Sequence, residues 1–122
     1  MSVIELTKEN FEETITSNDI VLIDFWAPWC GPCKSFAPIY EEVAAKTEGV
    51  VFAKVNTEDE QELGAHFQIR SIPTLMIFRE QIVLYSEAGM LPAAALEEIV
   101  EKVKSLDMDE VRKDIESQQQ EA

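Results

Sequence analysis

The chain has 122 residues, 46% of them hydrophobic, and 24 acidic against 10 basic side chains give it a formal net charge of −14. This length fits one domain with one core and is too short for two ordinary domains. The acidic charge would repel a phosphate backbone, which argues against nucleic acid as a partner, and no apolar stretch reaches the roughly 18 residues that a membrane helix needs.

The distribution of charge and the N-terminus bear on the setting of the protein. Acidic side chains are spread over most of the chain, which indicates a solvated surface, while a preference for basic partners is the alternative. The first ten residues, MSVIELTKEN, have no basic leader and include Glu5, so they do not resemble a secretory signal. We therefore expect a cytoplasmic protein that does not associate with membranes.

The N-terminal segment predicts a strand followed by a helix. Residues 3–6 alternate between apolar and polar side chains, as in a short strand. Thr7 then offers a hydroxyl N-cap for a helix that carries Phe11 and Ile15 at helical spacing.

A buried strand and a long helix enclose the two cysteines. Residues 20–26 are an apolar run that only Asp24 interrupts, which is the pattern of a strand buried on both faces of a sheet. After the cysteines, apolar side chains recur at intervals of three and four, which predicts a helix from about Cys33 to about Lys46. These apolar residues are Phe36, Ile39, Tyr40, Val43 and Ala44.

The second half predicts three strands and two helices. Residues 50–56 are a second buried strand, and residues 58–67 are a short acidic helix. The strands at 74–78 and 82–88 are close enough in sequence for an antiparallel hairpin. A helix begins at Pro92, because proline suits the first turn and an apolar stripe follows it. The stripe consists of Leu96, Ile99, Val100 and Val103. Strands that alternate with helices indicate an α/β domain.

An acidic extension at residues 106–122 follows a domain at residues 1–105. Asp107 and Glu110 resemble a capping box, and the pattern allows a short extra helix with the three glutamines after it frayed. The apolar stripe of this helix would be Met108, Val111 and Ile115. Either the extension is a solvated tail, or its helix docks on the body or on a partner.

The two cysteines, Cys30 and Cys33, have the spacing of a redox pair. When the second cysteine lies one turn inside a helix, the first lies at the helix N-terminus, where unpaired amides and their partial positive charge favour a thiolate. We therefore predict that Cys30 is the nucleophile and that Cys33 keeps its proton until it attacks the mixed disulfide. Between them, Gly31 lets a substrate backbone approach and Pro32 stiffens the turn.

Three other roles for the cysteine pair are a structural disulfide, part of a metal site, and two inert core thiols. A disulfide across two residues restrains little chain, and a reducing compartment would not keep it oxidised. A zinc site needs four ligands, but His66 adds only a third, and we expect it to be an ordinary surface residue. Thiol–disulfide exchange is therefore the favoured interpretation.

Asp24 has a task in this chemistry. An unpaired carboxylate in a buried strand costs roughly several kcal/mol, and desolvation should raise its pKa towards neutrality. Such a base could accept the proton of Cys33, directly or through a water, while Cys33 resolves the mixed disulfide. Lys54 is the candidate counter-charge, unless it reaches out to solvent.

Three segments together resemble the thioredoxin family: WCGPC at residues 29–33, DFWAP before it and RSIPTLMIF about forty residues later. The resemblance covers roughly residues 3–105. It implies the thioredoxin fold, in which α-helices flank a central mixed β-sheet, and a protein-disulfide reductase that binds no cofactor and no metal. It also implies that an NADPH-using, flavin-dependent thioredoxin reductase returns the disulfide to the dithiol. We expect a monomer that acts on disulfide-containing proteins.

The resemblance also assigns the reacting groups. It makes Cys30 the attacking thiol, Cys33 the resolving thiol, and Asp24 the buried base with Lys54 as its neighbour. These assignments agree with the roles that the residue pattern predicts.

Residues of the substrate-binding surface follow from the same resemblance. Pro73 matches the cis-proline of the family, unless it lies in an ordinary trans turn. A cis bond would set the backbone of Ile72 facing the cysteines, ready to hydrogen-bond an extended substrate. Trp29, Gly89 and Met90 would complete an apolar rim around the thiol, although Trp29 could instead be a packing aromatic.

Two features depart from the family pattern, and two functional alternatives remain. Residues 79–81 lack the glycine that usually follows TLMIF, which leaves the turn geometry open, and residues 106–122 have no counterpart in the minimal domain. An oxidase or isomerase would use the same chemistry, but Gly-Pro between the cysteines resembles the reductases. A binding module would instead use the surface and the acidic tail, with the thiols incidental.

Overall fold

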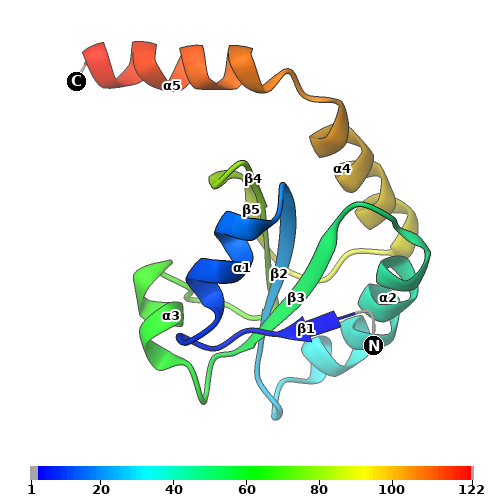
Figure 1. The fold of residues 1–122 in the computed structure, drawn as a ribbon. Helices are drawn as coiled ribbons and strands as arrows, with labels where there is room; N and C mark the ends of the chain where they lie inside the picture. Colours follow the sequence, from blue (N-terminus) through cyan, green and yellow to red (C-terminus); the bar gives the residue numbers. More distant parts are fainter. Residues whose placement is uncertain (1–2, 122) are drawn as a thin grey trace.

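The computed structural model describes residues 3–121, with side chains described through residue 119. Within this range the chain forms a five-stranded sheet that helices cover on both faces (Figure 1). The strands are β1 (Val3–Glu5), β2 (Ile20–Trp26), β3 (Val51–Asn56), β4 (Thr74–Arg79) and β5 (Ile82–Ala88). The helices are α1 (Phe11–Ser17), α2 (Gly31–Lys46), α3 (Gln61–His66), α4 (Ala93–Ser105) and α5 (Met108–Glu121).

The sheet is mixed, with the strand order β1-β3-β2-β4-β5. Strand β2 pairs in parallel with β3 and antiparallel with β4, and β5 completes a hairpin with β4. This confirms the predicted α/β class, the central place of the strand that carries Asp24, and the hairpin. None of the helices in residues 3–121 has the length and apolar content that crossing a bilayer requires.

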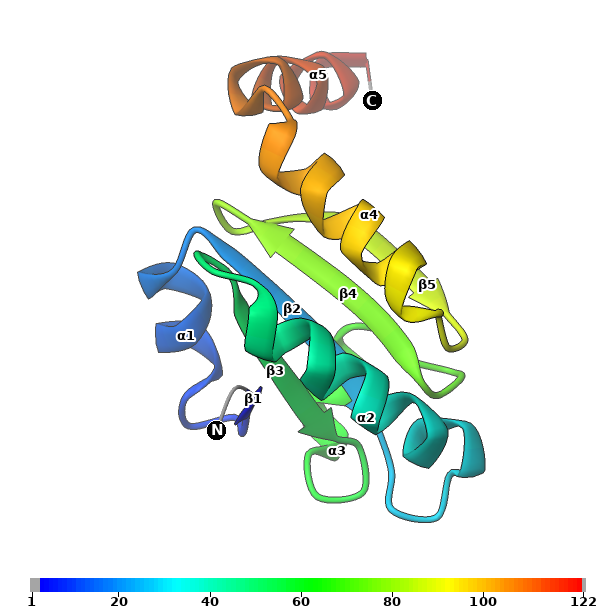
Figure 2. The same cartoon turned by 90° about the vertical axis from the view of Figure 1, so that its right-hand side faces the viewer.

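Strand β2 divides the core in two, because successive side chains of a strand point to opposite faces. Val21, Ile23 and Phe25 lie in the cluster that contains apolar residues of α1 and α3, whereas Leu22 lies in the cluster of α2 and α4. Figure 2 shows α2 and α4 lying across that second face. Asp24 is two residues from Leu22 and therefore lies on the same face, so its carboxyl group points towards α2.

Two helix boundaries differ from the sequence predictions. Thr7 is not the N-cap of the first helix, because the N-cap is Asn10. Thr7 belongs to the preceding turn, where its backbone carbonyl accepts the N–H groups of Asn10 and Phe11. Helix α2 begins at Gly31 instead of near Cys33, because a proline is tolerated in the first helical turn.

The hairpin turn between β4 and β5 consists of Glu80 and Gln81 alone, since Arg79 belongs to β4 and pairs with Ile82. Both turn residues have positive φ, 51° and 68°, as a type I′ turn requires. The turn therefore has positive φ at both positions although neither residue is a glycine. Two residues outside the hairpin bond to Glu80: its backbone N–H donates to the carbonyl of Asp19, and its carboxylate accepts from Arg112.

The C-terminal extension forms the helix α5, which lies beyond the end of the sheet (Figure 1). Asp107 caps it by accepting the amides of Asp109 and Glu110, and Met108 is buried. The helix includes the three glutamines and continues to Glu121.

Two arginines link this extension to the hairpin. Arg112 of α5 forms an ion pair with Glu80 of the turn. One terminal nitrogen of Arg79 donates to the carbonyl oxygens of Val103, Lys104 and Leu106 at distances of 2.7, 3.1 and 3.0 Å. Val103 and Lys104 lie in the last turn of α4 and Leu106 is its C-cap residue, so these carbonyls have no helical amide four residues further on; the Val103 carbonyl also accepts the N–H of Leu106.

Candidate active site

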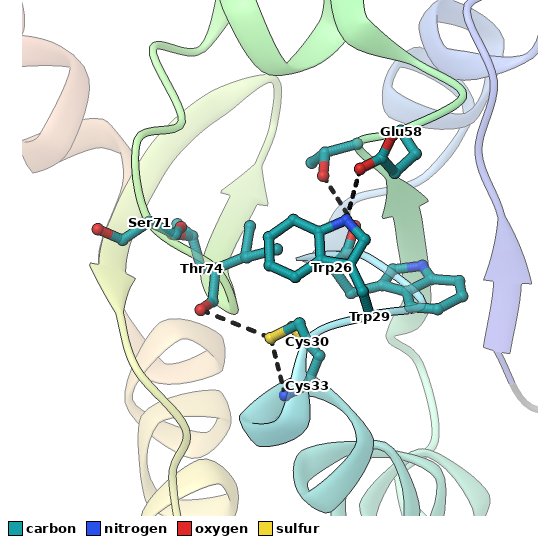
Figure 3. The surroundings of a disulfide bond; sticks show 9 residues. Trp26, Trp29, Cys30, Cys33, Glu58, Ser71 and Thr74 are labelled. Carbon is teal, nitrogen blue, oxygen red and sulfur yellow. Dashed lines mark hydrogen bonds between the residues drawn. A yellow bond between two sulfur atoms is a disulfide. The ribbon is translucent and has the colours of Figure 1, made fainter.

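The two cysteines form a disulfide at the N-terminus of α2 (Figure 3). Cys30 is the N-cap residue, and its Sγ accepts the backbone N–H of Cys33 at 3.2 Å. The Cα atoms of the two cysteines are 5.2 Å apart. The helix therefore directs an unpaired amide at one sulfur, as the predicted position of Cys30 requires.

The disulfide is largely covered by its surroundings. Only 4% of Cys30 and 2% of Cys33 are exposed, so the resolving cysteine is only slightly less accessible than the attacking one. Ala27, Trp26 and Ile72 pack against the pair. A substrate therefore reaches a sulfur in a shallow, mostly apolar setting.

Asp24 is buried behind Cys33, in the interior of β2. A cavity of about 100 Å³ is lined by Asp24, Cys33 and Lys54 together with Trp26, Lys34 and Ala37. The Oδ1 atom of Asp24 has no hydrogen-bond partner. Burial raises the pKa of Asp24 from 3.8 to about 7, while the positive charge of Lys54 acts in the opposite direction. This confirms the predicted shift of the pKa towards neutrality.

Lys54 lies next to Asp24, because the two residues are register partners in the parallel pair of β2 and β3. Its Nζ atom lies 5.2 Å from the centre of the Trp26 ring, in a cation–π position. No ion pair within 4.0 Å joins it to Asp24 in the described structure. Lys54 is thus a neighbouring charge that contacts an aromatic ring, and it is neither a bonded counter-ion nor fully solvated.

The loop before β4 faces the disulfide. The bond between Ile72 and Pro73 is cis, which confirms the expectation for Pro73. The carbonyl oxygen of Ile72 lies 3.8 Å from Cys30 Sγ. Gly89 belongs to the same surface, since its N–H donates to the carbonyl of Pro73 at 2.8 Å and its φ is +104°.

Trp29 and Met90 are both exposed at the protein surface. Trp29 is 67% exposed, so it is not a packing aromatic, and Met90 is 41% exposed. The indole N–H of Trp29 donates to the carboxylate of Glu58, which follows β3 (Figure 3). The ring is therefore held in one orientation beside the cysteines.

The comparisons with known proteins agree with this geometry. The family model described as thioredoxin matches residues 2–104. The chain belongs to the thioredoxin family. It is 54% identical over 121 residues to a protein from Streptomyces coelicolor named putative thioredoxin 2, covering 99% of this chain and 90% of that protein. It is 40% identical over 104 residues to a thioredoxin from Porphyra purpurea, covering 84% of this chain and 97% of that protein.

A solved structure supports the same assignment. A mutant thioredoxin from Halobacterium salinarum matches with a TM-score of 0.80 and 28% identity, covering 86% of this chain and 93% of that chain. Membership of the thioredoxin family makes the protein a thiol–disulfide oxidoreductase, and Cys30 and Cys33 form its redox-active disulfide.

The thioredoxin match also separates the body from the extension. The family model ends at residue 104, one residue before the end of α4. The Streptomyces relative aligns over 121 residues, so it also covers most or all of α5. The sequence of α5 therefore aligns with at least one relative and lies outside the thioredoxin family model.

Sequence reasoning missed two contributors to the site. Trp26 covers the disulfide and carries the Lys54 contact, but it appeared only as the end of an apolar run. Glu58 orients Trp29, although its sequence context is an acidic segment in which no residue stands out. His66 is exposed at the end of α3, and the described side chains, those of residues 3–119, contain no group of three suited to a metal ion.

Proposed function

We propose that the protein is a dithiol reductase of disulfide-containing proteins, with Cys30 as the attacking thiol. The observation that carries this proposal is the hydrogen bond from the Cys33 amide to Cys30 Sγ at the start of a 16-residue helix. The amide and the partial positive charge of the helix end favour an anionic sulfur at this position. Thiolate is the form that attacks disulfides.

The reaction has two displacements. The Cys30 thiolate attacks one sulfur of the substrate disulfide, which forms a mixed disulfide and releases the other substrate sulfur as a thiolate. The sulfur of Cys33 then attacks Cys30 Sγ, forming the internal disulfide and releasing the second substrate sulfur. Two electrons pass from the dithiol to the substrate. The two substrate sulfurs leave as thiolates and take protons from solvent, to which the proton lost by Cys33 is finally returned.

Asp24 is the acceptor of the Cys33 proton in the second displacement. Both residues line the cavity of about 100 Å³, which has room for water, so the transfer can be direct or through a water. A pKa of about 7 suits a group that must take up and release a proton near neutral pH. The positive charge of Lys54 favours the ionised form of Asp24 that can act as the base.

The substrate lies across the loop at Ile72 and Pro73. The carbonyl of Ile72 is close enough to Cys30 Sγ to bond the backbone of an extended segment whose cysteine sits at that sulfur. Gly31 has no atom within 4 Å of the position a Cβ would take, so the open space leaves room for that segment. Pro32, Trp29, Gly89 and Met90 supply the surrounding surface.

The oxidised protein is returned to the dithiol by thioredoxin reductase, which takes electrons from NADPH. This proposal rests on family membership, as does the cytoplasmic setting in which such a reductant is useful. We propose that the protein works as a monomer and binds no cofactor, because all of the groups that the reaction uses come from one chain.

The two cysteine positions test the function directly. The protein is reduced, freed of reductant and mixed with insulin, and released insulin thiols are counted after an acid quench. Cys30→Ser should release none. Cys33→Ser should attack once and accumulate a mixed disulfide that mass spectrometry detects. A Cys33→Ser variant that completes turnover would contradict the assignment of Cys33.

A double variant addresses the alternative of a binding module. If Cys30→Ser together with Cys33→Ser still supports the biological role of the protein, the thiols are incidental and the reductase proposal fails. If that role disappears together with insulin reduction, the reductase proposal stands. The equilibrium of the dithiol against a glutathione buffer then distinguishes a reductase from an oxidase.

A further inference from the structure

A surface hollow of about 380 Å³ lies beside the disulfide, on the side of α3. Its wall includes Trp29, Ile69 and Ile72, with the small residues Gly64 and Ala65 from α3. Arg70 is the one charged residue among the described residues that line it. The side chains that line the hollow are thus mainly small or apolar, and Arg70 contributes a single guanidinium group.

The hollow adjoins the reacting sulfur. Ile72, which lines it, places its carbonyl oxygen 3.8 Å from Cys30 Sγ. Trp29 precedes Cys30 in the chain, and the hydrogen bond to Glu58 orients the ring. An extended peptide advances about 3.3 Å per residue. A substrate side chain two residues from the reactive cysteine therefore lies about 7 Å along the peptide from it, a distance over which it can enter the hollow that Arg70 and Ile72 both line.

Arg70 is available to a ligand. It is exposed, and no carboxylate within the part of the chain that the structure describes lies within 4.0 Å of it. Six of the ten basic residues, in contrast, form ion pairs. The paired residues are Lys46, Arg79, Lys102, Lys104, Arg112 and Lys113.

The charge of the whole protein makes this position selective. With a net charge of −14, most of the surface repels an acidic segment, so the unpaired arginine that lines this hollow is a local exception, as are Lys34 and Lys54 at the cavity behind Cys33. The planar guanidinium matches a carboxylate with two parallel hydrogen bonds, which a lysine cannot reproduce.

We propose that this hollow is a subsite for an acidic side chain of the substrate, and that Arg70 determines a preference for Asp or Glu two residues from the reactive cysteine. The subsite rests on the proposed reductase function, because it selects among substrates of that reaction. It adds no step to the electron transfer and acts on the encounter that forms the mixed disulfide.

Symmetric peptide disulfides test the preference. Each peptide carries one residue type, Glu, Gln or Lys, at the positions two before and two after its cysteine. The protein is reduced with dithiothreitol, freed of it by gel filtration and mixed with excess peptide, and the released thiol is measured after an acid quench. Wild type should reduce the Glu peptide about two- to fivefold faster than the Gln peptide, and the Lys peptide more slowly, as expected for one exposed charge pair.

Variants of Arg70 supply the decisive comparison. Arg70→Gln should bring the Glu-to-Gln rate ratio to about one or below, and Arg70→Glu should make the Lys peptide the fastest. Raising the salt concentration to about 1 M should shrink the wild-type ratio, because the screening length falls to about 3 Å. A Glu preference that survives in Arg70→Gln would overturn the subsite.

A matched control separates local from overall charge. Lys113→Gln changes the net charge by the same amount, but Lys113 lies on α5, at the opposite end of the molecule from α3 (Figures 1 and 2). This variant should keep the wild-type ratio, and a loss of the ratio would assign the preference to net charge instead of Arg70. Failure of wild type to reduce the Gln peptide would instead contradict the reductase function, and equal rates on all peptides would contradict only the subsite.

Discussion

Asp24 and Arg79 are charged residues of neighbouring strands that lie at opposite ends of the β2–β4 pair. Asp24 is buried near the disulfide, and its Oδ1 has no hydrogen-bond partner. The side chain of Arg79 is 16% exposed, and one of its nitrogens serves three carbonyls at the end of α4. The carboxyl of Asp24 thus has an unbonded oxygen, whereas Arg79 bonds three carbonyls through one terminal nitrogen, although its buried Nε atom has no hydrogen bond and lies 3.6 Å from the carboxylate of Asp19.

The difference shows that one charged residue serves the reaction and the other serves the stability of the fold. A buried carboxyl without partners destabilises the folded state when it is ionised, and that same condition gives it a pKa useful for proton transfer. A partly buried arginine that donates to the carbonyls at a helix end stabilises the fold and is held away from the reaction by these bonds. Substitutions at the two ends should therefore change stability in opposite directions.

The largest effect is expected for Asp24→Asn in the oxidised protein. Burial raises the pKa of Asp24 from 3.8 in the unfolded chain to about 7 in the fold, so the folded state holds a proton that the unfolded state has lost between these values. Wild type should therefore lose stability as the pH rises from about 4 to about 7. Above pH 7 the asparagine variant should be more stable by about 4 kcal/mol.

Urea unfolding at pH 4 and pH 8 measures this difference. The variant should match wild type at pH 4, where the aspartate is protonated in the fold, and exceed it at pH 8. Equal gains at both pH values would show that the carboxyl is not the cause. The variant should also resolve mixed disulfides more slowly, because the acceptor of the Cys33 proton is gone.

Arg79→Met should act in the opposite direction. It removes the donors to three carbonyls and keeps an apolar stem of similar length, so we expect a loss of about 2 kcal/mol in the free energy of unfolding. Chemical denaturation of the oxidised protein measures the loss. The rate of insulin reduction should not change, since the residue is at the far end of β4 from Pro73. A large loss of activity in protein that is still folded would contradict this separation.

Deletion of residues 107–122 should have a smaller effect. We propose that residues 1–105 fold and act without the extension, because Met108 is the buried apolar residue of α5. The deletion should cost about 1 kcal/mol, less than full burial of a methionine contributes, because ordering the helix also costs entropy. Insulin reduction should stay within about twofold of wild type. A truncated protein that does not fold would show that α5 belongs to the domain.

The smallest effect is expected for Arg112→Ala. The ion pair between Arg112 and Glu80 is exposed, so its removal should leave the midpoint of global unfolding almost unchanged. Amide hydrogen exchange should become faster in α5 and unchanged in β2. Faster exchange near the cysteines would mean that the two ends are coupled.

Much of the fold could be predicted because the relevant signals are local. Strands β2, β3 and β4 are runs of apolar residues, and α4 has an apolar stripe at helical spacing. The cysteine pair and Asp24 could be identified because each breaks its local pattern: the one carboxylate in a buried strand, and two thiols one turn apart.

Other features depend on residues that are distant in the sequence. Glu58 orients Trp29 although the two residues are 29 positions apart, and no sequence pattern indicates that they are in contact. The positive φ of Glu80 is supported by contacts with Asp19 and Arg112 instead of by a glycine. Lys54 could be placed beside Asp24, but its contact with the Trp26 ring follows from the sheet register and from side-chain reach.

The sulfur of Cys30 is both a reacting atom and the cap of α2. A sulfur keeps lone pairs when it is a thiolate, when it is bound to a substrate and when it is bound to Cys33, so the Cys33 amide can remain bonded to it in each state. Electron transfer then needs little reorganisation of the backbone. We therefore expect the scaffold to stay the same throughout turnover, with the exchange confined to a few bonds at the end of one helix.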